Sequence, residues 1–309
     1  MQQSMLAING VQTHVITEGR WVEEGLASDG HKDLVLVIPG NPGIPSYYEG
    51  FIKSLKSKLP TETPVWIMGH AGHVLPPKNL SIALPEGQFT GKYYNLTGQL
   101  EHKISFIKKY VPKDAKIHLV GHSIGCWFIL QLLKDKEIAD RVVKCYLLFP
   151  TIERMRETPS GKFLTNFVLR FAAVIVYLCW IFSLLPIIIQ MILIRTIGGI
   201  FGVTNKTVKP TLQLLKAPVL KRVFDLAKDE MILVRELNHE IVSKYADKLW
   251  IYYGATDGWT PSIYYDELKA KYPNINAQIC KRGFRHAFVL SNDVQVGKMV
   301  GDLINESIL

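Results

Sequence analysis

The sequence predicts a doubly wound α/β fold built around a mostly parallel sheet. Short apolar runs typical of buried strands alternate with segments of helical periodicity along much of the chain. The stretch Val120-Gly121-His122-Ser123-Ile124-Gly125 lies between such a run and a helical segment, an arrangement typical of a nucleophile elbow. Hydrophobic residues make up 48% of the 309 residues, which is ordinary for a globular protein.

The fold is expected to have two core segments, 1–150 and 249–309. Alternating polar and apolar residues at 11–17 predict an edge strand. Apolar runs predict further strands at 34–38, 65–68, 117–120, 142–149, 249–253 and 277–280. Helices are expected at 46–59 with Ser46 as N-cap, at 96–110, at 126–133 and at 293–309. The long Gly- and Pro-rich loop 69–95 is expected to be functional.

The alternation stops in residues 151–248, which we interpret as a helical cap insertion. Its first part, 163–203, is strongly apolar. Arg170 and Arg195 border an uncharged run that Pro186 interrupts. A stretch of this length and composition is a candidate for contact with lipid.

Three interpretations of the apolar stretch are open at this point. It could be a single transmembrane helix, a hairpin or in-plane anchor that bends near 183–186, or the buried underside of the cap. A single span would put Ser123 and all later catalytic residues on opposite sides of a membrane. The hairpin or in-plane anchor is therefore favoured, because it can enter one leaflet and return.

Ser123 needs a base, since a serine hydroxyl is a poor nucleophile until its proton is removed. In α/β-hydrolases the partners follow the serine in the order acid, then histidine. Only His239 and His286 come after Ser123. His239 lies in the mixed-charge part of the insertion, whereas His286 follows the last predicted strand, where a loop can reach the sheet edge. We predict that His286 is the catalytic base.

The acid of the triad is predicted at Asp257. It follows the 249–253 strand in a turn, at the carboxyl end of the sheet where open α/β folds place their sites. Its role would be to orient the imidazole and stabilise the imidazolium. Glu153, after the 142–149 strand, is the reserve candidate, and Asp266 is less suitable because it lies inside a predicted helix.

Two backbone N–H groups are expected to stabilise the oxyanion. One is that of Ile124, directly after the nucleophile. The other should come from the turn after the 34–38 strand, where Pro42 has no N–H, so Asn41 is the better candidate and Gly43 the weaker one.

No metal or other cofactor is predicted. His70 and His73 form a tempting pair, but further ligands at suitable spacing are missing. The net charge of +9 comes without a dense basic block or a zinc or RNA motif, which argues against nucleic-acid binding and fits a general attraction to anionic membranes.

The compartment is expected to be the cytosol or a membrane surface that faces it. The four cysteines form no Cys-x-x-Cys pair, and two of them fall in predicted core elements, so we expect reduced thiols. The first ten residues lack the pattern of a signal peptide.

Four motifs together carry a family resemblance: Ile-Pro-Gly-Asn-Pro-Gly at 38–43, Gly-His-Ser-Ile-Gly at 121–125, Gly-Ala-Thr-Asp-Gly-Trp at 254–259 and Arg-His-Ala-Phe at 285–288. In these, and in the apolar insertion, the chain resembles the lipid droplet-associated hydrolases over nearly its whole length. The Gly-Asn-Pro-Gly turn is the more specific motif, because it replaces the His-Gly turn of many relatives. The triad positions show no departure from the family pattern.

This resemblance implies an α/β-hydrolase fold, serine hydrolase chemistry, a location on lipid droplets and the endoplasmic reticulum, and hydrolysis of sterol esters. The leading hypothesis is therefore a lipid ester hydrolase that contacts lipid through 163–203. Two alternatives stay open: a droplet-surface binding or organising protein with little turnover, and an acyltransferase on the same fold.

Overall fold

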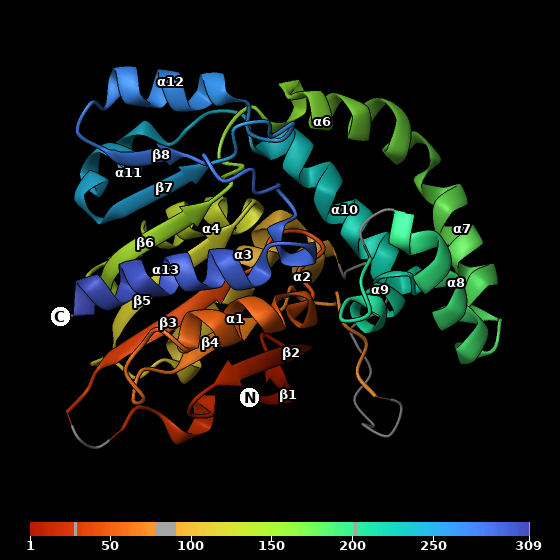
Figure 1. The fold of residues 1–309 in the computed structure, drawn as a ribbon, viewed down its shortest axis with the longest axis horizontal. Coiled ribbons are helices and arrows are strands. Elements are labelled where there is room, and N and C mark those ends of the chain that lie inside the picture. Colours follow the sequence, from red (N-terminus) through yellow and green to blue (C-terminus); the bar gives the residue numbers. More distant parts are fainter. Residues whose placement is uncertain (28–29, 78–90, 201–202, 309) are drawn as a thin grey trace.

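A computed structural model describes residues 1–27, 30–77, 91–200 and 203–308 (Figure 1). Its strands are β1 (Gln2–Ile8), β2 (Val11–Glu18), β3 (Asp33–Ile38), β4 (Val65–Met68), β5 (Lys116–His122), β6 (Val142–Leu148), β7 (Leu249–Tyr253) and β8 (Asn276–Ile279). They form one sheet in the order β1-β2-β4-β3-β5-β6-β7-β8. Every neighbouring pair from β4 to β8 is parallel, and β2 is antiparallel to both of its neighbours. The predicted mostly parallel sheet is confirmed.

Helices cover both faces of this sheet. The α-helices of the described residues, including those of the insertion, are α1 (Glu49–Lys56), α2 (Gly91–Tyr94), α3 (Leu96–Tyr110), α4 (Ile124–Leu132), α5 (Lys136–Ala139), α6 (Pro159–Phe163), α7 (Ala172–Ser183), α8 (Ile187–Ile200), α9 (Val208–Leu214), α10 (Ala217–Leu233), α11 (His239–Lys244), α12 (Ser262–Lys271) and α13 (Asp293–Ile308). Side chains of β3 alternate between two cores, with Leu34 and Leu36 packed with α3 and α4, and Val35 and Val37 packed with α1 and α13. Figure 1 shows α1 and α13 together on one face.

Two local predictions were wrong. The 11–17 segment is not at the edge, because β1 pairs along the whole of this segment and takes the edge position. Four of the seven residues of β1 are exposed and its first three are polar, so its sequence has no clear strand periodicity. The helix expected from Ser46 begins later: a 3-10 turn occupies Pro45–Tyr48, and the α-helix starts at Glu49.

The expected loop 69–95 is described only in part. Residues 78–90 lie outside the described residues, and α2 occupies the end of the interval. The four cysteines are unpaired, with three of them buried.

Between β6 and β7 the chain leaves the sheet and forms α6 to α11. The helices α7 and α8, joined by residues 184–186, form an antiparallel pair, called here the apolar hairpin, that lies away from the sheet at the right of Figure 1. One side of α7 packs against α10, and α8 packs against α9. The helix break falls at Pro186, as the sequence predicts.

The apolar hairpin exposes its hydrophobic side chains. Among the described residues, the exposed large hydrophobic side chains outside 163–200 are only Met1, Ile232, Leu233 and Ile263. No residue of α7 is buried, so the interpretation as the buried underside of a cap does not fit. The continuous helical segment Pro159–Ser183 is 25 residues long and, by length and composition, could cross a membrane.

Candidate active site

Ser123 lies at the sharp turn from β5 into α4. Its φ of 54° and ψ of −122° place it in a strained conformation that is uncommon for a residue with a side chain. Gly125 allows this turn to close, since a Cβ there would collide with the carbonyl oxygen of Ile38. The hydroxyl of Ser123 is thereby held at the carboxyl edge of the sheet, beside the N-terminus of α4.

The three residues predicted as a triad form one hydrogen-bonded chain. The Ser123 hydroxyl lies 2.9 Å from Nε2 of His286. On the other side of the ring, Nδ1 of His286 donates to Oδ2 of Asp257 at 2.7 Å. These residues come from the loops after β5, β7 and β8, so parallel strands bring residues up to 163 positions apart to one edge.

Asp257 is held ionised in a nearly buried position, with 1% of its side chain exposed. Burial raises the pKa of this carboxyl, but the hydrogen bond and charge of His286 lower it more, with help from the Trp259 N–H and from Thr260. The pKa therefore lies below its usual value. Trp259 N donates to Oδ1 at 2.8 Å and the Thr260 hydroxyl donates to Oδ2 at 2.9 Å, which fixes the carboxylate plane toward the imidazole.

The turn after β3 lies against the nucleophile. A Cβ at Gly40 would come within 2.9 Å of the Ser123 Cβ. The Gly43 N–H is already used, because it donates to the Gly40 carbonyl at 2.6 Å. Among the described residues no hydrogen bond involves the N–H of Asn41. Of the two predicted donors in this turn, only Asn41 therefore has an N–H without a protein acceptor among the described residues.

The side chain of Asn41 is held by the insertion. Its Nδ2 donates to the Val223 carbonyl at 3.1 Å and to Oε1 of Glu230 at 3.0 Å, both on α10. Glu230 is 4% exposed. Burial raises the pKa of Glu230 to about 8, although the hydrogen bond from Asn41 lowers it in part.

A second hydrogen-bond chain, missed by sequence reasoning, links the loops of the site through His122. Nε2 of His122 donates to the carbonyl oxygen of His286 at 2.9 Å. Its Nδ1 is then the acceptor, and the Tyr48 hydroxyl donates a hydrogen bond to it at 2.6 Å. The same hydroxyl accepts the N–H of Gly40 at 2.9 Å. Burial lowers the pKa of His122 to about 3, so the ring stays neutral.

A cavity of about 510 Å³ opens over Ser123 and His286. Most of its wall is apolar, with Val223 and Phe224 among the side chains that α10 contributes. Glu230 is a polar exception in this wall. Such a cavity matches the size and the apolar character of small-molecule sites.

Comparison with known proteins agrees with these motifs. A family model described as lipid-droplet associated hydrolase matches residues 31–289. The chain is 42% identical over 307 residues to the lipid droplet-associated hydrolase of Drosophila melanogaster, covering 99% of both chains. It is 33% identical to that of Homo sapiens, covering 100% of this chain and 96% of the other. The chain belongs to the lipid droplet-associated hydrolase family.

Solved structures similar to this family member show its fold. A thermophilic esterase from Thermogutta terrifontis aligns with a TM-score of 0.60 at 12% identity and 100% coverage of both chains. An epoxide hydrolase from Vigna radiata aligns with a TM-score of 0.62 at 13% identity, covering 99% of this chain and 98% of the other. The predicted α/β-hydrolase fold is confirmed.

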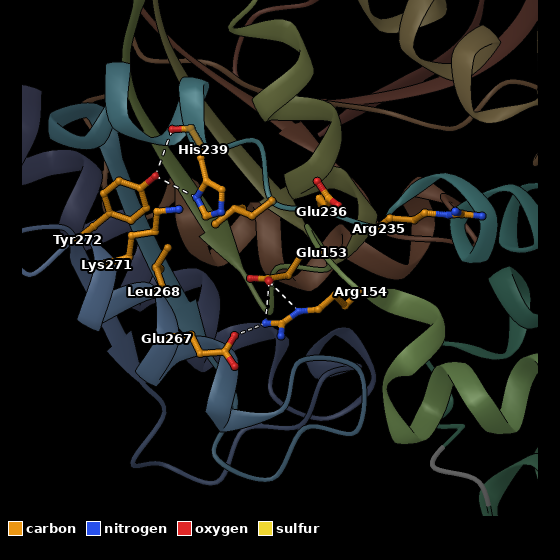
Figure 2. A pocket seen from close by; sticks show the side chains of 10 residues that line it. Glu153, Arg154, Arg235, Glu236, His239, Glu267, Leu268, Lys271 and Tyr272 are labelled. Carbon is orange, nitrogen blue, oxygen red and sulfur yellow. Dashed lines mark hydrogen bonds and ion pairs between the residues drawn. The ribbon is translucent and has the colours of Figure 1, made fainter.

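The reserve residues of this family member lie elsewhere. Figure 2 shows that Glu153 and His239 line one charged pocket, in which Glu153 pairs with Arg154 at 2.8 Å. Nδ1 of His239 lies 3.0 Å from the Tyr272 hydroxyl. Neither residue contacts the hydrogen-bonded chain of Ser123, His286 and Asp257. Asp266 lies on the exposed face of α12.

His70 and His73 support the turn that carries Asn41. Nδ1 of His73 donates to the Pro42 carbonyl at 2.5 Å, and the His70 ring fills the space beside Gly43. Burial lowers the pKa of both rings. No group of side chains suited to a metal ion occurs among the described residues.

Proposed function

We propose that this protein is a serine hydrolase that cleaves carboxylic esters of lipids. The observation that carries the proposal is the hydrogen-bonded chain from Ser123 through His286 to Asp257. This arrangement activates a serine for acyl transfer, and no cofactor takes part in it.

In the proposed first step, Ser123 Oγ attacks the ester carbonyl and Nε2 of His286 takes its proton. Asp257 stabilises the resulting imidazolium. The N–H groups of Ile124 and Asn41 donate to the oxyanion, a contribution of about 10²–10³ in rate for one such donor.

Collapse of the tetrahedral intermediate expels the alcohol, which receives the proton from His286 and leaves an acyl-Ser123 ester. Water then attacks this ester, with His286 again as base. The fatty acid leaves and Ser123 recovers its proton.

The proposed substrates are lipid esters, with sterol esters as the first candidates. The wall of the cavity is mostly apolar, which suits an acyl chain or a sterol ring system. Leu164, just before the apolar hairpin, and Val203, just after it, both line this cavity. A substrate that leaves a lipid phase along the hairpin therefore meets the cavity directly.

The proposed location is the surface of lipid droplets and of the endoplasmic reticulum, on the cytosolic side. Family relatives are named lipid droplet-associated hydrolases, and the exposed apolar hairpin provides a contact with lipid. Ser123 precedes the hairpin in sequence and Asp257 and His286 follow it, yet the three meet in one core. A hairpin that enters one leaflet and returns is compatible with this, whereas a single span is not.

The test is the turnover of purified full-length protein on sterol esters, glycerides and short acyl esters. We expect Ser123→Ala to lower kcat by at least about 10³-fold and to abolish labelling by a fluorophosphonate. Ser4→Ala, which changes an exposed serine on β1, is the control with unchanged activity. Full fluorophosphonate labelling of Ser123→Ala would rule out Ser123 as the nucleophile.

A second candidate is a droplet-surface binding or organising protein, favoured by the exposed hairpin, which explains targeting without turnover. Complete rescue of lipid phenotypes in a knockout by Ser123→Ala would support it. Acyl transfer uses the same acyl-enzyme with an alcohol acceptor. Release of free fatty acid alone, in the presence of labelled acceptor, would exclude it.

A further inference from the structure

The net positive charge of the protein is concentrated in the segment of the chain that contains the apolar hairpin. Residues 158–224 contain eight cations, namely Lys162, Arg170, Arg195, Lys206, Lys209, Lys216, Lys221 and Arg222, and no Asp or Glu. The whole chain has 36 cations and 27 anions, so the remainder has 28 and 27 and a net charge of +1. Nearly all of the net charge of +9 therefore belongs to the segment that includes the hairpin.

Two of the eight cations are engaged within the protein. Lys221 pairs with Asp225 at 2.7 Å. Arg222 is buried, donates to the Gly72 carbonyl at 3.0 Å and stacks on Tyr94.

The other six cations are exposed or half-exposed, and within the part of the chain that the structure describes they form no ion pair. We name them the cation collar: Lys162, Arg170, Arg195, Lys206, Lys209 and Lys216. Residues 158–224 contain no Asp or Glu that could offset these charges. The collar thus leaves a positive surface without local compensation.

The positions of Arg170 and Arg195 limit how deeply the apolar hairpin can enter a lipid layer. The uncharged arms 171–184 and 186–194 measure about 20 Å and about 13 Å at 1.5 Å per residue. One leaflet of a bilayer has a hydrocarbon depth of about 15 Å. A hairpin inserted to the start of its charges would therefore fill one leaflet and leave both guanidinium groups at the level of the lipid headgroups.

We propose that the apolar hairpin and the cation collar together bind an anionic phospholipid surface, with the collar against the headgroups. This rests on the proposed lipid-surface location and adds the lipid class that the surface selects. Insertion of the hairpin into a neutral surface needs no cations, whereas unpaired cations in and beside the hairpin along the chain are attracted to negative headgroups. The same contact turns the cavity over Ser123 toward the lipid, because Leu164 and Val203 at the base of the hairpin line it.

The experiment is flotation of the full-length protein with two kinds of vesicle. One is phosphatidylcholine alone, and the other has about one lipid in three replaced by phosphatidylserine. At ~0.1 M salt we expect the wild type to partition at least about tenfold more strongly onto the anionic vesicles, and most of this gain to vanish at ~0.5 M salt.

The collar variant Arg170→Gln, Arg195→Gln, Lys206→Gln is expected to lose most of the gain on anionic vesicles. Its binding to phosphatidylcholine vesicles, which reports the hairpin alone, should stay within about twofold of wild type.

The matched control removes the same net charge elsewhere, as Lys53→Gln, Lys113→Gln, Lys134→Gln. These lysines are exposed and have no ion pair within the described ranges. The control should keep the full gain.

Equal binding of the wild type to both kinds of vesicle would overturn the proposal but leave the anchor intact. This result is expected if the cation collar binds an acidic protein and not anionic lipid. An equal loss in collar variant and control also overturns it. Absence of binding to either vesicle overturns the anchor as well. Ester turnover, measured separately, tests the proposed chemistry independently.

Discussion

His122 is the residue at which three loops of the site meet. Its ring connects the Gly40 turn, through Tyr48, with the backbone of His286. The distances between the Ser123 hydroxyl, the turn at Gly40 and the His286 imidazole therefore depend on one neutral, buried ring. Such a network positions reacting groups without contact with the substrate.

Tyr48→Phe is predicted to lower kcat by about tenfold with little change in KM. The change keeps the ring but leaves the Gly40 N–H and Nδ1 of His122 buried without partners, at about 1–3 kcal/mol per group. Steady-state kinetics on a short acyl ester measure it.

The control is Tyr245→Phe, which removes a hydroxyl outside the site. A structural role alone would lower the Tm of Tyr48→Phe and leave the kcat of the folded enzyme unchanged, and that result would contradict the positioning role.

At the residue scale, a contact could be predicted only where a local sequence motif marks the residues that make it. The hydrogen-bonded chain of Ser123, His286 and Asp257 was predictable, because each residue follows a recognisable strand and their order is restrictive. The Tyr48–His122 and Asn41–Glu230 contacts join residues 74 and 189 positions apart. Nothing local marks those pairs, so only the folded chain shows them.

At the scale of elements, α10 joins the insertion to the sheet. Its Arg222 donates to the Gly72 carbonyl, and its Glu230 accepts from the Asn41 side chain. The helix thus fixes two loops of the site at once. It was predicted only as part of a mixed-charge helical region, because these two contacts are made by charged side chains that nothing local marks as buried.

Glu230→Gln is predicted to stabilise the protein at neutral and alkaline pH. The pKa of Glu230 in the folded protein is about 8, above the ordinary value of 4.5. The free energy of unfolding is therefore highest below pH 4.5, where the carboxyl is neutral in both states, and it falls as the pH rises to 8. Gln keeps an oxygen acceptor and no charge. The gain should grow from pH 5 to 8, to on the order of 2 kcal/mol.

Thermal unfolding across this pH range measures the gain in Glu230→Gln. The exposed Glu236→Gln is its control, with no such gain. A Tm of Glu230→Gln at or below that of wild type at pH 8 would contradict the prediction.

Element boundaries were predictable where burial is complete. The apolar runs of β3, β4 and β7 have every residue buried, and each was located to within one residue. β1 was missed because it is mostly exposed, with a polar start. Strand formation there depends on pairing with β2, which is a tertiary effect.

At the scale of the whole molecule, the apolar hairpin lies away from the sheet whose edge carries Ser123. A hairpin variant Leu184→Asp, Ile188→Asp is predicted to lose association with lipid droplets. Each charge costs about 2.5–3.5 kcal/mol within a hydrocarbon layer, so partition should fall more than about 100-fold. Hydrolysis of a soluble short acyl ester should persist, because both residues are exposed and distant in sequence from the cavity lining.

Droplet fractionation with a parallel ester assay measures this. Ile263→Asp, which changes an exposed hydrophobic side chain on α12, is the control and should stay on droplets. Unchanged droplet binding of the hairpin variant would defeat the anchor.

The global fold was predictable because strands and helices alternate along most of the chain, and this alternation indicates a parallel sheet. The path of the insertion was not. Its composition indicated lipid contact and a bend at Pro186, but the roles of Leu164 and Val203 as cavity walls depend on how the hairpin returns.

The place of the apolar hairpin in the chain also has a consequence for synthesis. A ribosome releases β5, Ser123 and then the hairpin before it makes Asp257 and His286. Domains assemble as their elements emerge, and exposed apolar surface seeks cover at once. On our proposal, the nascent chain acquires its affinity for lipid while its active site is still incomplete. The protein can therefore associate with lipid before it becomes active.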